Sequence, residues 1–245
     1  MRRFYIEDLS EDASNVFVTG EEFVHISKVL RLRQGTAVVL FNGEGLELTG
    51  RLEAVFKDYA VVAVDSATRL VGESRLKTAL IVGLVKADKP ELIIQKSTEL
   101  GVTELVFYPA DRSVPVADAD RAGQRLIRWR RVAIEAAKQC GRSTLPRLSL
   151  APDMSVALNG LDGMLKLQLW ESEKDRGLND VLKEPLSENG VAFLVGPEGG
   201  FAEEEVEAAR LAGFITVSLG PRILRAETAA IVMLAIIQHR YGDMR

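Results

Sequence analysis

A glycine-rich loop followed by acidic residues is the first feature of this chain that could form a ligand site. The segment FLVGPEGGFAEEEVEAA, residues 193–209, runs from an apolar stretch through the loop at 196–200 into a helix that begins with three glutamates at 203–205. Such loops usually bind phosphate, because the free N–H groups and the dipole of the helix attract anions. Here Glu198 and the three glutamates already supply negative charge and would repel a phosphate. A ligand without phosphates is therefore expected.

A second loop, in LGPRILRAETAAIVMLAII at 219–237, repeats the Gly-Pro pair at the end of an apolar segment. Arg222, Arg225, Glu227 and Thr228 crowd the start of a helix that is otherwise almost wholly apolar. These polar groups lie where a core meets a cleft. Arg225 and Glu227 either take part in chemistry there or pair with each other.

A ligand that suits both loops is bound mainly by backbone and apolar groups. Neither loop has the Lys-Ser/Thr of a P-loop or a full G-x-G-x-x-G, which argues against a polyphosphate and against a nicotinamide enzyme on a Rossmann sheet. S-Adenosylmethionine, with an adenosine, a cationic sulfonium and no phosphate, meets this description. The alternative is that GPEGG is a tight turn, followed by glutamates that favour the helix dipole.

Both loops follow strands of a predicted sheet. Apolar segments predict strands at 78–85, 104–109, 164–171, 191–196 and 214–220, and a helix at 88–101 has Asp88 as its expected cap and Pro90 in its first turn. Strands alternating with helices predict an α/β fold with a mostly parallel sheet. Because ligands bind beyond the carboxyl ends of such strands, the two loops are expected to be two walls of one pocket.

Residues 1 to about 72 have a different pattern. Apolar and polar residues alternate through 36–65, and NGEG at 42–45 supplies the positive φ angles of a hairpin, so a small β-barrel is predicted. The polar segment SATRLVGESRLK at 66–77 breaks the alternation. We therefore expect one domain at 1–72 and a second at 73–245.

Composition restricts the class of protein. Hydrophobic residues make up 47% and charged residues 27% of the 245 residues, which is ordinary for a globular protein. One cysteine and two histidines leave little for a metal site, so no metal is expected. No segment has the roughly 20 apolar residues of a membrane span, and no secretory signal begins the chain, so a cytoplasmic protein without membrane contact is expected.

The net charge of −4 conceals a basic segment: residues 112–147 contain nine basic and three acidic side chains. A local concentration of arginine on an acidic protein suits a nucleic-acid contact, because phosphates respond to a positive patch rather than to net charge. A solvated helix face is the alternative interpretation.

Taken together, these motifs resemble those of a known family. LVGPEGGF followed by LGPRILRAETAA is similar to the paired signature of the ribosomal RNA small subunit methyltransferase E family, the uridine N3-methyltransferases of the SPOUT class. HISKVLRLRQG (25–35), KADKPELIIQKSTELGV (86–102), DRSV (111–114) and WRRVAIEAAKQCGR (129–142) also match its pattern. The resemblance spans nearly the whole chain.

The resemblance implies an N-terminal PUA-like β-barrel that helps to bind RNA and a C-terminal SPOUT domain with a deep trefoil knot that binds S-adenosylmethionine. It also implies a homodimer with the active site near the subunit interface. The expected substrate is 16S ribosomal RNA, either naked or within the small ribosomal subunit. Only the resemblance supplies the knot, since general rules of chain connection argue against one.

The motifs and the basic segment give three sets of candidate residues. Cofactor binding is expected of Val195, Gly196, Pro197, Glu198, Gly199, Gly200, Ser218, Leu219, Gly220, Ile223 and Leu224, with the strand end at Trp170 and Glu171 as a third candidate. RNA binding is expected of Arg31, Arg33, Arg112, Arg121, Arg125, Arg128 and Arg142. The candidate catalytic residues are Arg222, Arg225 and Glu227.

The hypothesis for the reaction is in-line transfer of the sulfonium methyl to N3 of a uridine. That nitrogen is protonated at neutral pH, so the site needs a base or cations that stabilise the uridine anion. Glu227 is the candidate base, and Arg225 or Arg222 is the candidate cation. The alternatives are a SPOUT methyltransferase that acts on another RNA and a noncatalytic RNA-binding assembly factor.

Overall fold

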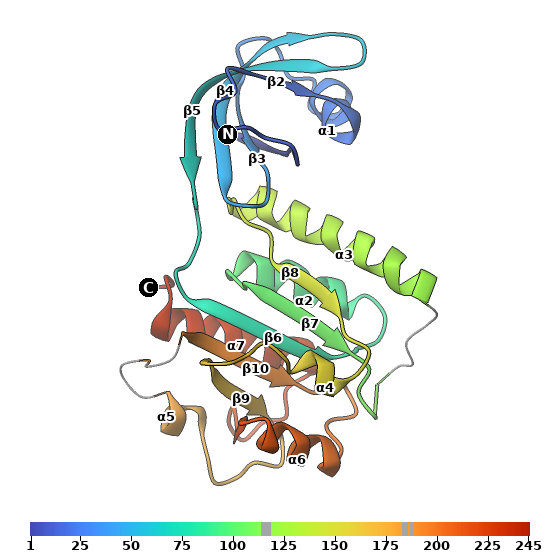
Figure 1. Ribbon diagram of the computed structural model, residues 1–245, viewed down its shortest axis with the longest axis vertical. Coiled ribbons are helices and arrows are strands. Elements are labelled where there is room, and N and C mark those ends of the chain that lie inside the picture. Colours follow the sequence, from blue (N-terminus) through green and yellow to red (C-terminus); the bar gives the residue numbers. More distant parts are fainter. Residues whose placement is uncertain (114–118, 183–185, 187–188) are drawn as a thin grey trace. The chain divides into compact units, whose positions relative to one another are not determined.

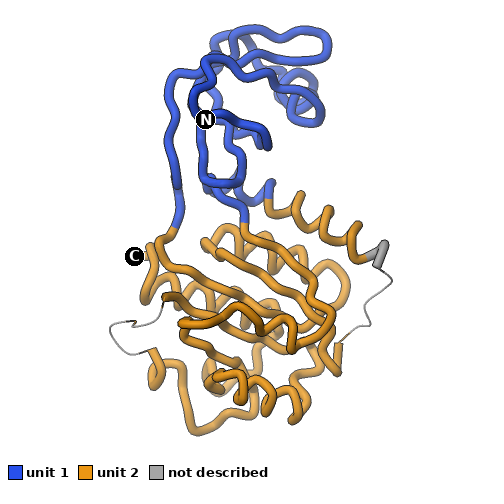
Figure 2. The backbone as a smooth tube through the Cα atoms, in the orientation of Figure 1, with its two compact units in different colours: residues 1–73, 134–145 blue, residues 74–133, 146–245 orange. Residues whose placement is uncertain are grey.

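The computed structural model describes residues 1–113, 119–182, 186 and 189–245, and the chain forms two compact units. The first contains residues 1–73 and 134–145, and the second contains residues 74–133 and 146–245 (Figure 2). The long helix α3 (Ala119–Cys140) therefore contributes to both. The division expected at residue 72 did not anticipate that 134–145 belongs with the first unit.

The first unit is built on a five-stranded sheet with the order β1-β3-β4-β5-β2. Its elements are β1 (Arg2–Tyr5), β2 (Asn15–Val18), helix α1 (Gly20–Val24), the π-helical segment η1 (His25–Val29), β3 (Ala37–Phe41), β4 (Leu46–Val55) and β5 (Ala60–Arg69). Strands β1 and β3 are parallel, and the other pairs are antiparallel. Phe4, Leu40 and Leu48 are fully buried in its core. The NGEG turn has the predicted geometry, with φ of 78° at Gly43 and 97° at Gly45.

Strand β5 extends further than the sequence predicted. Residues 66–69 were placed in the polar break between domains, but Ser66 pairs with Thr49 and Arg69 pairs with Leu46 in the ladder with β4. This end of β5 is exposed. Its polar side chains therefore meet solvent on the strand, and the loss of apolar alternation did not mark the end of the strand.

The second unit contains a six-stranded parallel sheet with the order β11-β9-β10-β6-β7-β8 (Figure 1). The strands are β6 (Lys77–Gly83), β7 (Glu104–Tyr108), β8 (Arg147–Leu150), β9 (Leu165–Leu169), β10 (Gly190–Val195) and β11 (Ile215–Val217). The helices besides α3 are α2 (Lys89–Glu99), α4 (Met154–Ala157), α5 (Leu178–Val181), α6 (Glu203–Leu211) and α7 (Ala226–Tyr241). The parallel sheet expected from the alternating pattern is confirmed.

Helices cover both faces of this sheet. On one face Ile81 and Leu194 pack in a core with Val206 of α6. Phe107 of β7 contacts Trp129 of α3, with ring centroids 4.5 Å apart. Helix α7 packs against α2 and β10, which explains why its sequence is apolar on nearly all sides.

Helix α2 begins close to where the sequence placed it. Asp88 occupies the predicted cap position, although its side chain makes no capping hydrogen bond. Pro90 lies in the first turn, where its missing N–H costs no helical hydrogen bond. The helix ends at Glu99, shortly before Gly101 with its φ of 82°.

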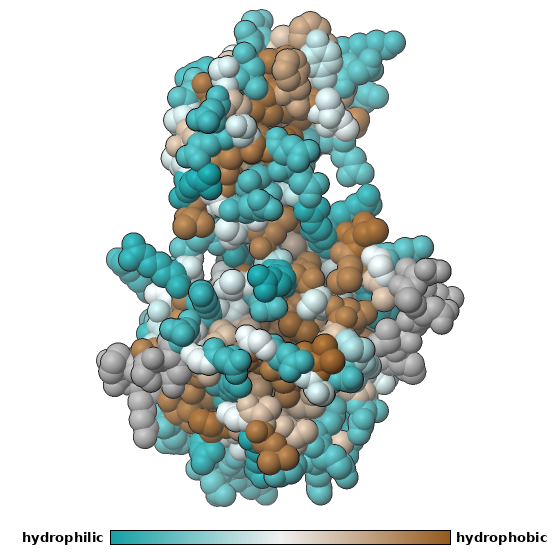
Figure 3. All heavy atoms as spheres, viewed as in Figure 1, coloured by the Kyte–Doolittle hydropathy of each residue, from teal (hydrophilic) through white to brown (hydrophobic). Residues whose placement is uncertain are grey.

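Hydrophilic and apolar residues are interspersed over the face shown in Figure 3. No helix within the described ranges is long and apolar enough to cross a membrane. Among the same residues, no group of three or more His, Cys, Asp or Glu side chains is arranged to hold a metal ion.

Candidate functional site

An open pocket lies at the carboxyl ends of β9, β10 and β11. Leu169, the last residue of β9, is in register with Val195 of β10 on one side and with Val217 of β11 on the other. The loops that leave β10 and β11 therefore start on either side of β9. The structure brings the two Gly-Pro loops together, as the parallel sheet predicted.

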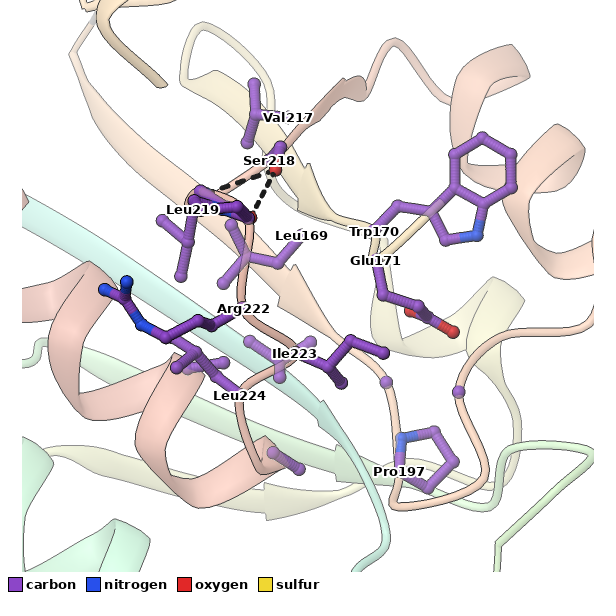
Figure 4. A pocket seen from close by; sticks show the side chains of 17 residues that line it. Leu169, Trp170, Glu171, Pro197, Val217, Ser218, Leu219, Arg222, Ile223 and Leu224 are labelled. Atoms are coloured by element: carbon purple, nitrogen blue, oxygen red, sulfur yellow. Dashed lines mark hydrogen bonds between the residues drawn. The ribbon is translucent and has the colours of Figure 1, made fainter. Parts of the chain in front are cut away.

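The pocket walls come from the end of β9, the two loops and the first turns of α7 (Figure 4). The lining residues are Leu169, Trp170, Glu171, Val195, Gly196, Pro197, Gly200, Val217, Ser218, Leu219, Gly220, Pro221, Arg222, Ile223, Leu224, Ala226 and Ala229. Apolar side chains and backbone make up most of this wall.

Glycines give the loops their shape. Gly200 has a φ of +71°, and a Cβ atom there would overlap Oε1 of Glu171. A Cβ on Gly196 would stand 3.1 Å from the ring of Phe201. Gly220 in the second loop has a φ of +118°, which L side chains rarely adopt. A side chain at Gly200 or Gly196 would therefore shift the first loop or its neighbours.

The pocket presents little positive charge. Among its described lining residues, Arg222 and Glu171 carry the formal charges. Figure 4 shows that Arg222 extends away from Glu171 and Pro197, whereas Ile223 lies toward them. The side chain of Ile223 is 84% exposed. The hydroxyl of Ser218 bonds the N–H and carbonyl of Gly220, both at 3.2 Å, and so shapes the turn.

Beside the pocket, Lys89 contacts a carboxylate from each loop region. Its Nζ lies 2.9 Å from Oε1 of Glu198 and 3.5 Å from Oε2 of Glu227. The backbone N–H of Lys86 donates another hydrogen bond to Oε1 of Glu198, at 3.0 Å. We call Lys89, Glu198 and Glu227 the lysine cluster.

Hydrogen bonding keeps two members of the lysine cluster charged. Burial acts to raise the pKa of Glu198, but the hydrogen bonds from Lys89 and from the N–H of Lys86 outweigh it and hold this pKa below its ordinary value of 4.5. The hydrogen bond to Glu198 raises the pKa of Lys89 above its ordinary value, although desolvation opposes the change. Both groups are therefore ionised at neutral pH.

Glu227 lies in the first turn of α7 and is buried, with 9% of its surface exposed. Its Oε2 accepts no hydrogen bond from the described part of the chain, and its ion contact there is with Lys89 rather than with Arg225. Arg225, at the N-cap of α7, is exposed. The sequence left open whether Arg225 pairs with Glu227. In the structure the ion contact of Glu227 is with Lys89 of helix α2 instead.

The pocket gathers most of the predicted cofactor residues. Those that line it are Val195, Gly196, Pro197, Gly200, Ser218, Leu219, Gly220, Ile223 and Leu224, together with Trp170 and Glu171. Glu198 instead belongs to the lysine cluster. Gly199 lies against Arg112, whose Nη1 donates to its carbonyl at 3.3 Å. The sequence did not single out the lining residues Leu169, Val217, Ala226 and Ala229.

The sequence also missed Lys89, although one signal was present. Lys89 is the first residue of α2, where the helix dipole disfavours a cation by about 0.3–1 kcal/mol. A lysine at that position suggests that carboxylates lie nearby. Glu198 is 109 residues away along the chain, so spacing alone does not identify it.

The predicted RNA-binding arginines lie in different surroundings. Arg31 and Arg33 are exposed on the first unit, and Arg112 is exposed on the second. Arg128 pairs with Glu91 at 2.6 Å. The guanidinium of Arg125 lies 5.9 Å from the ring centroid of Trp129. The side chain of Arg121 lies outside the described residues, as does Val114 of the DRSV motif.

The assignment of Arg142 as a surface RNA contact is wrong. Its guanidinium is buried in the first unit, 3.0 Å from Oε2 of Glu73, and it donates to the hydroxyl of Thr144 at 3.1 Å. An arginine held this way connects residues 134–145 to the rest of its unit. Its charge is matched by Glu73 and is not free to meet a phosphate.

A groove with a volume of about 600 Å³ lies between the start of α2 and helix α3 in the second unit. Its lining residues are Leu84, Val85, Lys86, Ala87, Pro90, Glu91, Gln124, Arg125, Arg128 and Trp129. Three cations and one carboxylate give these described residues a positive balance. Unlike the pocket, the groove is suited to an anionic ligand.

Comparison with known proteins identifies the family. The RNA methyltransferase domain family matches residues 72–238, and the RNA methyltransferase PUA domain family matches residues 18–65. The ribosomal RNA small subunit methyltransferase E of Bacillus subtilis is 34% identical over 253 residues, which cover 100% of this chain and 99% of the relative. This chain belongs to the ribosomal RNA small subunit methyltransferase E family.

Solved structures agree with membership of the small subunit methyltransferase E family. The enzyme of that name from Neisseria gonorrhoeae, bound to S-adenosyl methionine, has a TM-score of 0.88 and 33% identity, with 100% of both chains covered. A methyltransferase from Legionella pneumophila, in complex with the bound cofactor SAM, has a TM-score of 0.89 and 32% identity and covers 99% of this chain and 98% of its own. The family expected from the sequence, with a PUA-like unit before a mostly parallel methyltransferase unit, is confirmed.

Proposed function

We propose that this protein transfers the methyl group of S-adenosylmethionine to N3 of a uridine in small-subunit (16S) ribosomal RNA. The observation that carries the proposal is the pocket at the ends of β9, β10 and β11, in which family-typical loops form a wall of backbone and apolar side chains. Relatives of this chain carry the name of a ribosomal RNA methyltransferase, and two similar structures hold the methyl donor.

The pocket residues fit S-adenosylmethionine. Ile223, Leu219 and Leu224 offer apolar contacts to an adenine, and Glu171 offers a carboxylate to hydroxyl or ammonium groups. The pocket has a volume of about 110 Å³, less than drug-sized ligands usually occupy, and it is open to solvent, so a nucleoside would extend beyond it. When bound, the cofactor supplies an activated methyl group.

The chain's own residues must deal with the proton on N3. Glu227 is a buried carboxylate whose Oε2 has an ion contact with Lys89 at 3.5 Å and no closer donor among the described residues, and we propose that this carboxylate accepts the proton. Arg225, exposed at the start of α7, and Arg222, at the pocket wall, are the groups placed to stabilise negative charge on the uracil. N3 lies on the pairing edge of the base, so the target uridine is presented unpaired.

We further propose that RNA contacts the groove through Arg125 and Arg128 and the first unit through Arg31 and Arg33. Exposed cations position a phosphate backbone without reading its sequence. Arg112 is assigned to the same task beside the first loop. We also propose that the protein is a homodimer and that it acts in the cytoplasm, on naked 16S RNA or on the small subunit.

Calorimetric titration tests the cofactor assignment. The purified protein is expected to bind S-adenosylmethionine and neither ATP nor NAD. Ile223→Asp should weaken that binding at least about tenfold, because it puts a charge in an apolar contact. It should not lower the melting temperature of the protein, because Ile223 is already exposed. Leu211→Asp is the matched control, since Leu211 is 83% exposed but does not line the pocket. Absence of binding, alone and with ribosomal RNA, would favour a noncatalytic RNA-binding factor.

Salt dependence tests the RNA assignment. The double variant Arg125→Ala, Arg128→Ala should bind ribosomal RNA more weakly and lower the slope of log K against log salt by about 0.7 for each phosphate that the variant no longer neutralises. Arg147→Ala is the control, because Arg147 is exposed at the amino end of β8, whereas the groove begins beyond the carboxyl end of β6. Equal slopes in all three proteins would remove these arginines from the interface.

A further inference from the structure

Lys89 lies at a position that is unfavourable for a lysine unless nearby carboxylates compensate its positive charge. It begins the eleven-residue helix α2, where the free N–H groups already make the local potential positive. Its side chain is nonetheless only 24% exposed and is directed at two carboxylates that are 27% and 11% exposed. Glu198 is exposed as a residue, but Glu227 is buried, so Lys89 joins an exposed carboxylate to a buried one, unlike a surface pair in which both partners are solvated.

The two carboxylates come from different walls of the pocket. Glu198 lies in the first loop, between Pro197 and Gly200 of the lining. Glu227 follows the second loop directly and lies between the lining residues Ala226 and Ala229 of α7. The backbone N–H of Lys86 holds the same oxygen of Glu198 that Lys89 holds. One short segment, 86–89, therefore contacts a residue from each of the two walls.

We infer that Lys89 is a positioning residue that couples the two pocket loops, so that the first loop and the start of α7 keep the spacing the ligand requires. Without the ammonium, Glu198 and Glu227 are two carboxylates near one another with no cation between them, and they repel. The loops then separate or fluctuate independently. The inference rests on the proposed function only in naming the ligand as S-adenosylmethionine.

Hydrogen exchange of the ligand-free protein tests the coupling directly. Lys89→Met, which keeps an unbranched side chain one atom shorter and removes the charge, should speed amide exchange about tenfold in both 196–201 and 219–229, and at the N–H of Lys86. Lys96→Met is the control: Lys96 lies on the same helix and its Nζ binds Glu99 at 2.9 and 3.0 Å. Its loss should leave both loops unchanged. Faster exchange in only one loop, in neither, or throughout the protein would overturn the inference.

Cofactor binding and rescue provide the second readout. Lys89→Met should weaken S-adenosylmethionine binding about tenfold, and Lys89→Arg, which restores the cation, should recover most of it and restore slow exchange in both loops. Full affinity in Lys89→Met would contradict the inference. If the wild-type protein does not bind S-adenosylmethionine, the proposed function fails, and the coupling is still decided by the exchange experiment.

Discussion

Gly200→Val is expected to weaken S-adenosylmethionine binding by at least about 100-fold, because it combines backbone strain with displacement of a pocket residue. A β-branched residue strongly disfavours the φ of +71° that Gly200 adopts. The new Cβ also overlaps Oε1 of Glu171, so either the loop or that carboxylate must move. Calorimetric titration measures the loss, and the melting temperature shows whether the protein remains folded.

Gly160→Val separates these two causes. Gly160 has a nearly equal φ of +75°, but a Cβ there meets nothing within 4 Å, and the residue is outside the pocket. Gly160→Val should therefore lower the melting temperature by a similar amount and leave cofactor affinity unchanged. If the two variants bind the cofactor equally well, the first loop does not hold it.

The pocket could be predicted because each of its two loops is marked by residues that are adjacent in the sequence. Each Gly-Pro pair directly follows an apolar strand, and parallel strands end at one edge of a sheet, so the loops at 196–200 and 219–224 had to meet if their strands were neighbours. The structure adds the register of Leu169 with Val195 and Val217, which decides which strand lies between them. The trefoil knot implied by the resemblance stays a prediction.

The interactions that the sequence did not reveal depend on distant partners. Arg142 looked like one more cation of a basic helix, but Glu73 neutralises it in the first unit. Glu198 looked like part of the ligand surface, but it turns to Lys89. In each case the residue type gave the charge of the side chain but not its partner. Ion pairs form between residues that are far apart in the sequence, so local spacing does not identify them. The exposed strand end at 66–69 of β5 was missed for a related reason: alternation of apolar and polar residues reports burial of one face of a strand, and both faces are exposed here.

Glu227→Gln is expected to lower kcat for RNA methylation by about 10²–10⁴-fold, the usual contribution of a general base, with a much smaller change in S-adenosylmethionine affinity. Glutamine keeps the shape and the contact with Lys89 but cannot accept the N3 proton. The residual rate of the variant should also rise toward alkaline pH more steeply than the wild-type rate, because the uracil then loses its proton to solvent. Single-turnover measurements at saturating cofactor across pH provide both quantities.

Two comparisons decide whether Glu227 acts on the proton or only on the fold. Glu204→Gln changes an exposed glutamate in the first turn of α6, so it should keep wild-type turnover and pH dependence. Arg225→Ala should lower kcat without making the rate more dependent on alkaline pH, since a cation stabilises the uracil anion after the proton has left. If Glu227→Gln and Arg225→Ala both retain wild-type turnover with cofactor binding intact, neither residue acts in the reaction. If Glu227→Gln instead lowers both the melting temperature of the protein and its affinity for the cofactor, the role of Glu227 is only to hold Lys89 between the two loops.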